Sequence, residues 1–508
     1  MNLCTPPSQG RMPCDLETIP GLSRRRLVQA LGAGALLRSS ALLASAPSAG
    51  CRLPSLAGRL PPGSPRPMVR VAVPYQEESP AQNAGALALE RALPAIHEAA
   101  GGAFTVAPER TPLPRPPAGA SAPRQPGELT PFGQALAGLV AADHAPDLVY
   151  IQPAGGTPLT PVWDAQSMTM HGLLASLEPA LARESRRIRL ADFLPPALNA
   201  LRWQGALYGL PTTARPLMLA YDPALFAASA EPAPDMYPEG ITWEGVRASA
   251  GRLLRVAPGE GYPTQGGLLV TPPDHVLGQL LLAWGAPWWD AAQAQPHLHT
   301  PATVEALRFW KALRQRESGT VPFPGVAYGV RWEPARIMAS ALRVAMAFTW
   351  QPPAGRAALA AQGAPVLRLA EPPRAAVRTS LLWVDGFLAV PAAAPDLGRS
   401  VQALGAVLDG LGPALAWTVR EATPERLAAD PAIASPEEAR LVLAVRRSAQ
   451  ATPLHLPSPS RVLWELARAV ETGQQPPEEA AQVAQAALAQ ELERFMAQVE
   501  AARAGRGR

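Results

Sequence analysis

One segment, residues 202–226, constrains the fold of this chain more than any other. Its sequence is RWQGALYGLPTTARPLMLAYDPALF. It predicts a strand pair that closes on Gly205, then an extended stretch bounded by prolines, and then a helix that starts at Tyr221-Asp222-Pro223. With 508 residues the chain is too long for one ordinary core. We therefore expect two lobes.

The composition favours a folded body and gives little support to nucleic-acid binding. Apolar residues make up 48% of the chain and charged residues 17%, which is typical of a globular protein. The net charge of +4 is small for this length, and basic residues do not cluster with aromatic ones after residue 68.

The three cysteines, Cys4, Cys14 and Cys51, all precede the first expected folded residue. The folded body is therefore expected to have neither a disulfide nor a thiol, which suits an exported protein. The seven histidines show neither HxxxH nor HExxH spacing. The sequence thus predicts no metal site of these types and no cofactor.

Residues 1–51 are expected to form an export segment. Ser23-Arg24-Arg25-Arg26 has the form of a twin-arginine signal, and a broken stretch of small apolar residues follows it. Residues 48–51, SAGC, resemble a lipobox, so Cys51 is a candidate for lipidation. Ser48 stands where that pattern has leucine, and an ordinary cleavage site is the alternative. Met12 is an alternative start to Met1.

The first part of the body reads as strand, helix and strand. Residues 52–67 form a flexible tether rich in Pro, Ser and Gly, and 69–73 alternate as a strand. A helix is expected over 83–100, ending at two glycines, and a strand over 104–106. This order builds a parallel sheet. Residues 107–131 carry many prolines and are predicted to be an irregular surface insertion.

Further elements follow from local patterns. We expect a helix over 132–142, a buried strand over 147–152, and helices over 242–254 and 300–314 that begin at the caps Thr242 and Thr300. Short apolar strands are expected over 345–348 and 383–391. Helices over 457–502 close the chain.

Several of these segments, in this order, resemble the extracellular solute-binding proteins of ABC importers, in the sugar-type branch called family 1. Residues 203–226 match the family pattern xxGKxYGxPxxxxxxxxxYNxxLF, although Ala206 replaces the lysine and Asp222 the asparagine. Similar segments are the Pro-Asp strand at 146–150, LLASLEPAL at 173–181, TWEGV at 242–246, AMAFTW at 345–350 and WVDGFLAVP at 383–391. The resemblance covers most of the chain after residue 68.

The resemblance implies a two-lobed α/β fold of type II, in which each lobe is a mostly parallel sheet flanked by helices. The chain would cross between the lobes three times. We expect lobe 1 to hold 68–214 and 388–445, and lobe 2 to hold 218–384 and 450–508. Ligands of open α/β sheets bind beyond the carboxyl ends of the strands.

Tryptophan is unusually frequent, with 12 against 7 tyrosines and 9 phenylalanines. Sugar rings present apolar faces that stack on indole, and their hydroxyls need convergent hydrogen-bond partners. The resemblance implies stacking residues at Trp163, in a loop after the 147–152 strand, at Trp350, and at Trp464. Trp288 and Trp289 are candidates at the rim, with one of the two expected to pack inside. Core packing is the alternative for each of the five.

The polar candidates are fewer. Gln152 ends a strand. By the resemblance, Arg215 lies in the first connection between the lobes, within 202–226, and Trp383 and Asp385 lie in the second, within 383–391. An arginine or a carboxylate here can bind a ligand group bidentately. Arg215 favours an anionic ligand such as a sugar acid, whereas Asp385 favours a neutral polyol, and both remain open. Purely structural roles are the alternative.

The sequence thus predicts an exported substrate-binding protein, periplasmic or at the cell surface and anchored by lipid. It would capture a carbohydrate or a related polyol as a monomer, by hinge closure, and deliver it to ABC permease subunits. A receptor, sensor or scaffold that kept this fold without transport is the alternative. GxSxG, GxxxxGK[ST] and GxGxxG are all absent, so an enzyme is not expected.

Overall fold

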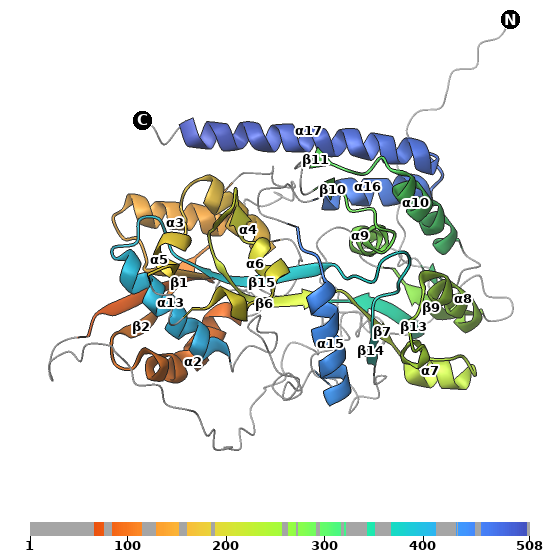
Figure 1. Ribbon diagram of the computed structural model, residues 1–508, viewed down its shortest axis with the longest axis horizontal. Helices are drawn as coiled ribbons and strands as arrows, with labels where there is room; N and C mark the ends of the chain where they lie inside the picture. Colours follow the sequence, from red (N-terminus) through yellow and green to blue (C-terminus); the bar gives the residue numbers. More distant parts are fainter. Residues whose placement is uncertain are drawn as a thin grey trace, which may run out of the picture. The chain divides into compact units, whose positions relative to one another are not determined.

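In the computed structural model (Figure 1), most of the chain after residue 65 is described. Residues 1–56 form one unit and residues 57–508 the other, and everything below concerns the second unit. The described ranges are 66–75, 84–113, 129–151, 160–183, 188–256, 263–270, 273–290, 295–315, 320–321, 343–350, 367–412, 433, 435–452 and 459–504. Cys51, the predicted lipidation site, and the predicted export segment and tether lie outside them, apart from residues 66 and 67.

The first sheet has five strands in the order β2-β1-β3-β15-β6. Their bounds are Thr105–Pro112 (β2), Met68–Tyr75 (β1), Leu148–Ile151 (β3), Leu382–Ala389 (β15) and Leu210–Pro216 (β6). The pairs of β1 with β2 and β3 are parallel, and those of β15 with β3 and β6 are antiparallel. Its helices are α2 (Ala84–Ala100), α3 (Pro131–Ala141), α4 (Thr160–Met170), α5 (Glu178–Leu181), α6 (Pro195–Asn199) and α13 (Leu397–Leu411).

The second sheet has the order β12-β9-β13-β7-β14, with β8 paired to β9. Its strands are β12 (Thr320–Val321), β9 (Pro263–Leu269), β13 (Arg343–Thr349), β7 (Met218–Tyr221), β14 (Arg368–Ala370) and β8 (Arg255–Val256). Helices near it are α7 (Pro223–Ala228), α8 (Trp243–Leu253), α9 (Pro273–Ala283), α10 (Pro301–Leu313), α15 (Pro436–Ser448), α16 (Ser460–Glu471) and α17 (Pro477–Ala504). Smaller elements are η2 (Leu190–Asp192), η3 (Pro234–Met236) and the pairs β4 (Arg202–Trp203) with β5 (Ala206–Leu207) and β10 (Trp289–Asp290) with β11 (Gln295–Pro296).

The two-sheet α/β architecture confirms the predicted fold class, although the sheets are mixed rather than mostly parallel. The reason lies in the connections. The chain leaves the first sheet along β6 and enters the second along β7, and it returns to the first sheet along β15. A strand that leaves and a strand that enters beside it run in opposite directions, so β6 and β15 are antiparallel.

Local signals in the sequence formed the expected elements. Gln204 and Gly205 take φ values of +50° and +86° and join β4 to β5 in the predicted tight turn. The side chains of Thr242 and Thr300 cap α8 and α10 by accepting N–H groups three residues ahead. Asp222 caps α7 in the same way, through Ala224 N–H at 2.9 Å.

Strand β2 contradicts part of the predicted irregular insertion at 107–131. It continues through Pro108 and Pro112 in parallel register with β1. β2 is an edge strand, and the N–H of Val106 points away from β1 to the imidazole of His97, at 3.0 Å. N–H directions alternate along a strand, and Pro108 and Pro112 lie an even number of residues after Val106. The N–H that each proline lacks would therefore point to the same unpaired side as that of Val106. Residues 114–128 of the insertion lie outside the description.

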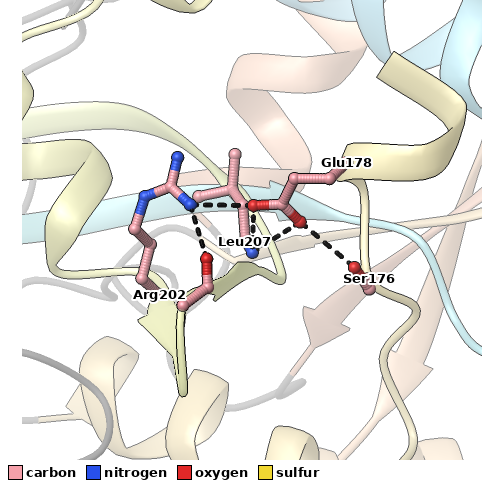
Figure 2. Close-up of polar contacts among 5 residues, drawn as sticks. Ser176, Glu178, Arg202 and Leu207 are labelled. Carbon is pink, nitrogen blue, oxygen red and sulfur yellow. Dashed lines mark hydrogen bonds and ion pairs between the residues drawn. The ribbon is translucent and has the colours of Figure 1, made fainter. Parts of the chain in front are cut away.

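Glu178 joins two of the segments that resembled the family (Figure 2). Its carboxylate accepts the N–H of Leu207 at 2.7 Å from each oxygen, and also the side chains of Arg202 at 2.8 Å and Ser176 at 3.1 Å. Arg202 donates in addition to the carbonyl of Gly205, at 2.8 Å. Glu178, at the start of α5, therefore fixes the β4–β5 hairpin from which β6 continues.

Replacing Glu178 with alanine should lower the free energy of unfolding by about 1.5–3 kcal/mol, because the N–H of the fully buried Leu207 loses its acceptor. Glu178→Gln keeps an acceptor oxygen and should cost less than half as much. Arg202→Ala removes a partly exposed ion pair and an exposed hydrogen bond to the carbonyl of Gly205, at about 1 kcal/mol. Urea unfolding followed by circular dichroism measures all three, and equal costs for Arg202→Ala and Glu178→Ala would refute this account.

Three chain segments pass beside one another between the two sheets. Leu217 N–H donates to the carbonyl of Leu381 at 2.8 Å, and the hydroxyl of Ser380 donates to the carbonyl of Leu217 at 2.9 Å. Gln450 N–H donates to the carbonyl of Ser380 at 2.8 Å, and Leu382 N–H donates to the carbonyl of Gln450 at 2.6 Å. We call these residues, 217, 380–382 and 450, the crossing.

Parts of the observed cores differ from the predicted lobe boundaries. Val442 and Val445 of α15, assigned to lobe 1 from sequence, pack with Met218 and Leu369 of the second sheet. Residues 382–384, assigned to lobe 2, belong to β15 of the first sheet. Helix α17 reaches both cores: Ala480, Ala481, Ala484 and Leu488 pack in the second, and Phe495 and Val499 in the first. Which core each of these segments joins depends on side-chain packing with distant parts of the chain, which local sequence patterns do not contain.

Candidate functional site

An aromatic cluster of Trp350, His275 and Trp383 lies next to the crossing. Trp350 follows β13, His275 is in α9 and Trp383 is in β15, so both sheets contribute. The rings of Trp350 and His275 are 5.3 Å apart between centroids at 82°, and those of Trp350 and Trp383 are 5.8 Å apart at 71°. Both are edge-to-face contacts, the geometry that aromatic pairs favour. Trp350 and Trp383 remain half-buried.

The indole N–H of Trp350 donates to Nδ1 of His275 at 3.1 Å. This bond requires a neutral imidazole with its proton on Nε2, which faces Asp274 Oδ2 at 3.7 Å. His275 is 6% exposed, and burial lowers its pKa below 6.5, while the charge of Asp274 opposes that shift. The geometry and the burial thus both favour the neutral form.

Arg215 and Trp383 are directly opposite each other in the β6–β15 register. Directly paired residues of antiparallel strands point to the same face, so the guanidinium lies on the side of the sheet that carries the indole. Nε1 of Trp383 is buried, and no acceptor bonds to it among the residues that the structure describes. Three of the predicted residues, Trp350, Trp383 and Arg215, are therefore gathered here.

Other predicted residues lie elsewhere or outside the description. Trp288 and Trp289 are each 6% exposed and both pack in the second core, where only one of the two was expected. Trp464 is half-buried on α16. Trp163 lies in helix α4 rather than in a loop, and its side chain is not described. Gln152 falls outside the described residues, and Asp385 is described only in its backbone, within β15.

Two polar residues of α9 were missed from sequence. Besides His275, the fully buried Gln279 donates to the carbonyl of Thr379 at 2.9 Å and accepts the N–H of Leu381 at 2.7 Å. It thereby ties α9 to the crossing. The available signal was their position within the apolar run of 273–283, where a polar side chain needs a partner.

Across the described ranges, no group of three His, Cys, Asp or Glu side chains is arranged to hold a metal ion. A search of the same ranges finds no helix with the length and apolar character needed to cross a bilayer.

Solved structures share this fold. One is an ABC substrate-binding protein of Listeria monocytogenes in complex with cycloalternan, with 14% identity, a TM-score of 0.58, and coverage of 83% of this chain and 98% of that one. The GacH receptor of Streptomyces glaucescens, solved unliganded and with acarbose, has 17% identity, a TM-score of 0.57 and coverage of 85% and 99%. UgpB of Mycobacterium tuberculosis in complex with glycerophosphocholine has 15% identity, a TM-score of 0.58 and coverage of 85% and 100%. No match was found among curated proteins.

These likenesses define the class of the fold, the two-lobed solute-binding proteins of type II. The sequence model of the bacterial extracellular solute-binding proteins matches residues 131–403, more than half of the chain. The chain therefore belongs to the bacterial extracellular solute-binding protein family. The resemblance noted from the 202–226 segment is confirmed.

Proposed function

We propose that this chain is the substrate-binding component of an ABC importer and captures a carbohydrate or a related polyol. The observation that carries the proposal is the half-buried indole pair of Trp350 and Trp383 beside the crossing. Indole surfaces suit the apolar faces of sugar rings, and Arg215 offers donors to hydroxyls or to an anionic group. A ligand oxygen near Trp383 would also give its indole N–H an acceptor.

The crossing supports a hinge in this function. Three short segments connect the two sheets, and their mutual hydrogen bonds run between backbone groups and the hydroxyl of Ser380. Bending there changes a few backbone angles and leaves most of each core unchanged, although α17, which packs in both cores, must shift with it. We propose that ligand binding favours an arrangement in which both sheets contribute to the site, and that permease subunits recognise that arrangement. Among the similar structures, one is in complex with cycloalternan and another with acarbose, which supports a carbohydrate.

Export belongs to the same proposal. The family consists of bacterial extracellular solute-binding proteins, and residues 23–26 have the twin-arginine pattern of an export signal. We propose that the chain acts outside the cytoplasm, attached by lipid at Cys51. Metabolic labelling with a fatty-acid probe should tag the wild type and leave Cys51→Ser unlabelled. Equal labelling of both would refute the anchor.

A thermal-shift screen of residues 68–508 tests the function, with maltotriose, acarbose, D-tagatose and glycerophosphocholine as probes. A ligand at 100 times its Kd adds about 2.7 kcal/mol of stability, which for a chain of this length raises Tm by about 3 °C. Trp350→Ala should abolish the shift. Trp350→Phe keeps an aromatic face and should retain part of it.

A well-folded protein that responds to no probe would contradict the carbohydrate assignment and favour a receptor or scaffold without transport. A shift that Trp350→Ala leaves unchanged would refute the proposed site while retaining the function. Circular dichroism of each unliganded variant separates loss of binding from loss of folding.

A further inference from the structure

We propose that His275 is a positioning residue: its Nδ1 holds the indole of Trp350 in place, and protonation of His275 releases that indole. The proposal rests on the proposed function for its effect on ligand binding. Its structural part, the control of Trp350 by His275, stands on the contacts alone.

Two contacts from different elements define the orientation of Trp350. Its N–H bonds to His275 of α9, and its ring meets the ring of Trp383 of β15. The bond to His275 sets the direction of the indole edge, because a hydrogen bond weakens steeply when it bends. Without it, the half-buried ring keeps its edge-to-face contact with Trp383 and its apolar packing, which fix the direction of the indole N–H less closely.

His275 is itself rigidly placed. Every residue of α9 from Asp274 to Ala283 is buried, and Gln279 one turn further on bonds to Thr379 and Leu381. A buried imidazole is costly unless its nitrogen atoms have partners, and Nδ1 has one in Trp350. The ring therefore offers Trp350 a fixed acceptor on a helix that cannot turn freely.

The pKa of His275 is lowered by its burial and raised by the charge of Asp274, and burial has the larger effect. The helices α10 and α16 pack against α9. Lys311 and Arg468 on these helices are exposed to solvent, and the other charged side chains pair elsewhere. Arg308 pairs with Glu305 and Glu478, Arg314 with Glu471, and Arg461 with Glu465 and Glu491. On the first sheet, Arg215 lies opposite Trp383 in the β6–β15 register.

The pKa of His275 sets the direction in which pH changes the hydrogen bond between His275 and Trp350. Because the pKa of His275 in the folded protein lies below the value of 6.5, the ring is neutral at pH 7 and Nδ1 accepts. As the pH falls through the folded pKa, Nδ1 gains a proton and becomes a donor that faces the N–H donor of Trp350. The stability contributed by the neutral ring is fully present above 6.5 and declines as the pH falls toward the folded pKa.

The first test observes Trp350 without any ligand. In protein labelled with ¹⁵N-tryptophan, the indole N–H resonance that disappears in Trp350→Phe should shift on acidification with a midpoint below pH 6.5. In His275→Gln, whose amide oxygen can accept, the resonance should show no such titration. In His275→Phe it should be displaced at every pH. A wild-type resonance indifferent to pH, or one that His275→Phe leaves in place, would overturn the proposal.

The second test measures binding of acarbose and maltotriose by calorimetry at pH 7.5 and at a pH below the midpoint of the Trp350 indole titration. His275→Phe should weaken binding about 5–10-fold at pH 7.5, as expected for one hydrogen bond, while His275→Gln stays within about 2-fold of wild type. Wild-type affinity should fall on acidification, and that of His275→Gln should not.

The two proposals fail in different ways. If His275→Phe binds like wild type at both pH values while Trp350→Ala does not bind, the role of His275 is refuted and the proposed function stands. If neither sugar binds or Trp350→Ala binds normally, the proposed site fails, and the indole resonance alone decides whether His275 positions Trp350. Unchanged Tm values at pH 7.5 verify that the His275 variants fold.

Discussion

Replacing Trp243 with alanine is expected to lower the free energy of unfolding by about 3–5 kcal/mol, the range for loss of a large buried aromatic side chain. Trp243 is fully buried at the start of α8. Its ring stacks on Phe348 at 5.3 Å and 25°, and meets Phe309 at 6.2 Å and Trp284 at 6.4 Å. Alanine leaves a cavity that neighbours on a helix, on a strand and in the turn after α9 cannot all fill.

Trp243→Phe is the matched control. The indole N–H of Trp243 is buried and has no acceptor within the described part of the chain, so phenylalanine removes an uncompensated donor along with part of the ring. We expect it to cost less than half as much as the alanine variant. Urea unfolding followed by far-UV circular dichroism measures both. Equal losses would mean that the N–H has a partner and that packing is not the dominant contribution.

Gly410→Ala should be the other severe substitution, at about 3 kcal/mol, near the upper end for overpacking. A Cβ at Gly410 of α13 would lie 2.6 Å from the backbone nitrogen and 2.7 Å from the Cα of Ile96 in α2. Backbone atoms cannot rotate away as a side chain can, so the two helices would have to separate. The loss should appear as a lower unfolding midpoint, measured by urea titration.

Gly138→Ala provides a control of opposite sign. Gly138 is an exposed residue inside α3, and a Cβ there would have no atom within 4 Å. Alanine should raise the free energy of unfolding by up to about 1 kcal/mol, because it favours the helix and restricts the unfolded chain. A neutral Gly410→Ala would contradict the close approach of α2 and α13, and a destabilising Gly138→Ala would contradict the open space at that position of α3.

The sequence predicted best the features that depend on neighbouring residues. The caps Thr242 and Thr300 and the turn at Gly205 each involve groups within three positions along the chain. Such contacts form whatever the rest of the fold does. The order of these local features also carried the family resemblance, which the match over 131–403 confirms.

Features that depend on distant partners were predicted less well. The prolines at 108 and 112 argue against a strand until the position of β2 at the edge of the sheet is known. The packing of α15 against β7 and β14 depends on contacts such as that of the Leu369 N–H with Glu438, at 3.2 Å, between residues 69 positions apart. Periodicity along one segment contains no information about such a partner.

The candidate site shows the same division. Trp350 was named from the resemblance and Arg215 and Trp383 from their places in the predicted connections between the lobes, and the three come together in the structure. His275 and Gln279 were not named, since their roles depend on Trp350 and Leu381, which are more than 70 residues away. Trp288 and Trp289 are tryptophans like Trp350, and they differ from it in being buried in the second core.

Helix α17 packs in both cores, and this packing affects the free energy of moving one sheet against the other, far from Trp350. Its first half packs in one core and its last turns in the other, where Phe495 meets Trp203 at 5.6 Å and 60°. If one sheet rotates against the other as proposed, α17 must shift in one core or the other, and the cost of that shift is part of the free-energy difference between the two arrangements. A substitution in α17 that changes this cost would then change ligand affinity by up to the same amount, with no ligand contact altered. The last helix of this chain would thus be a place where sequence changes tune affinity without changing specificity.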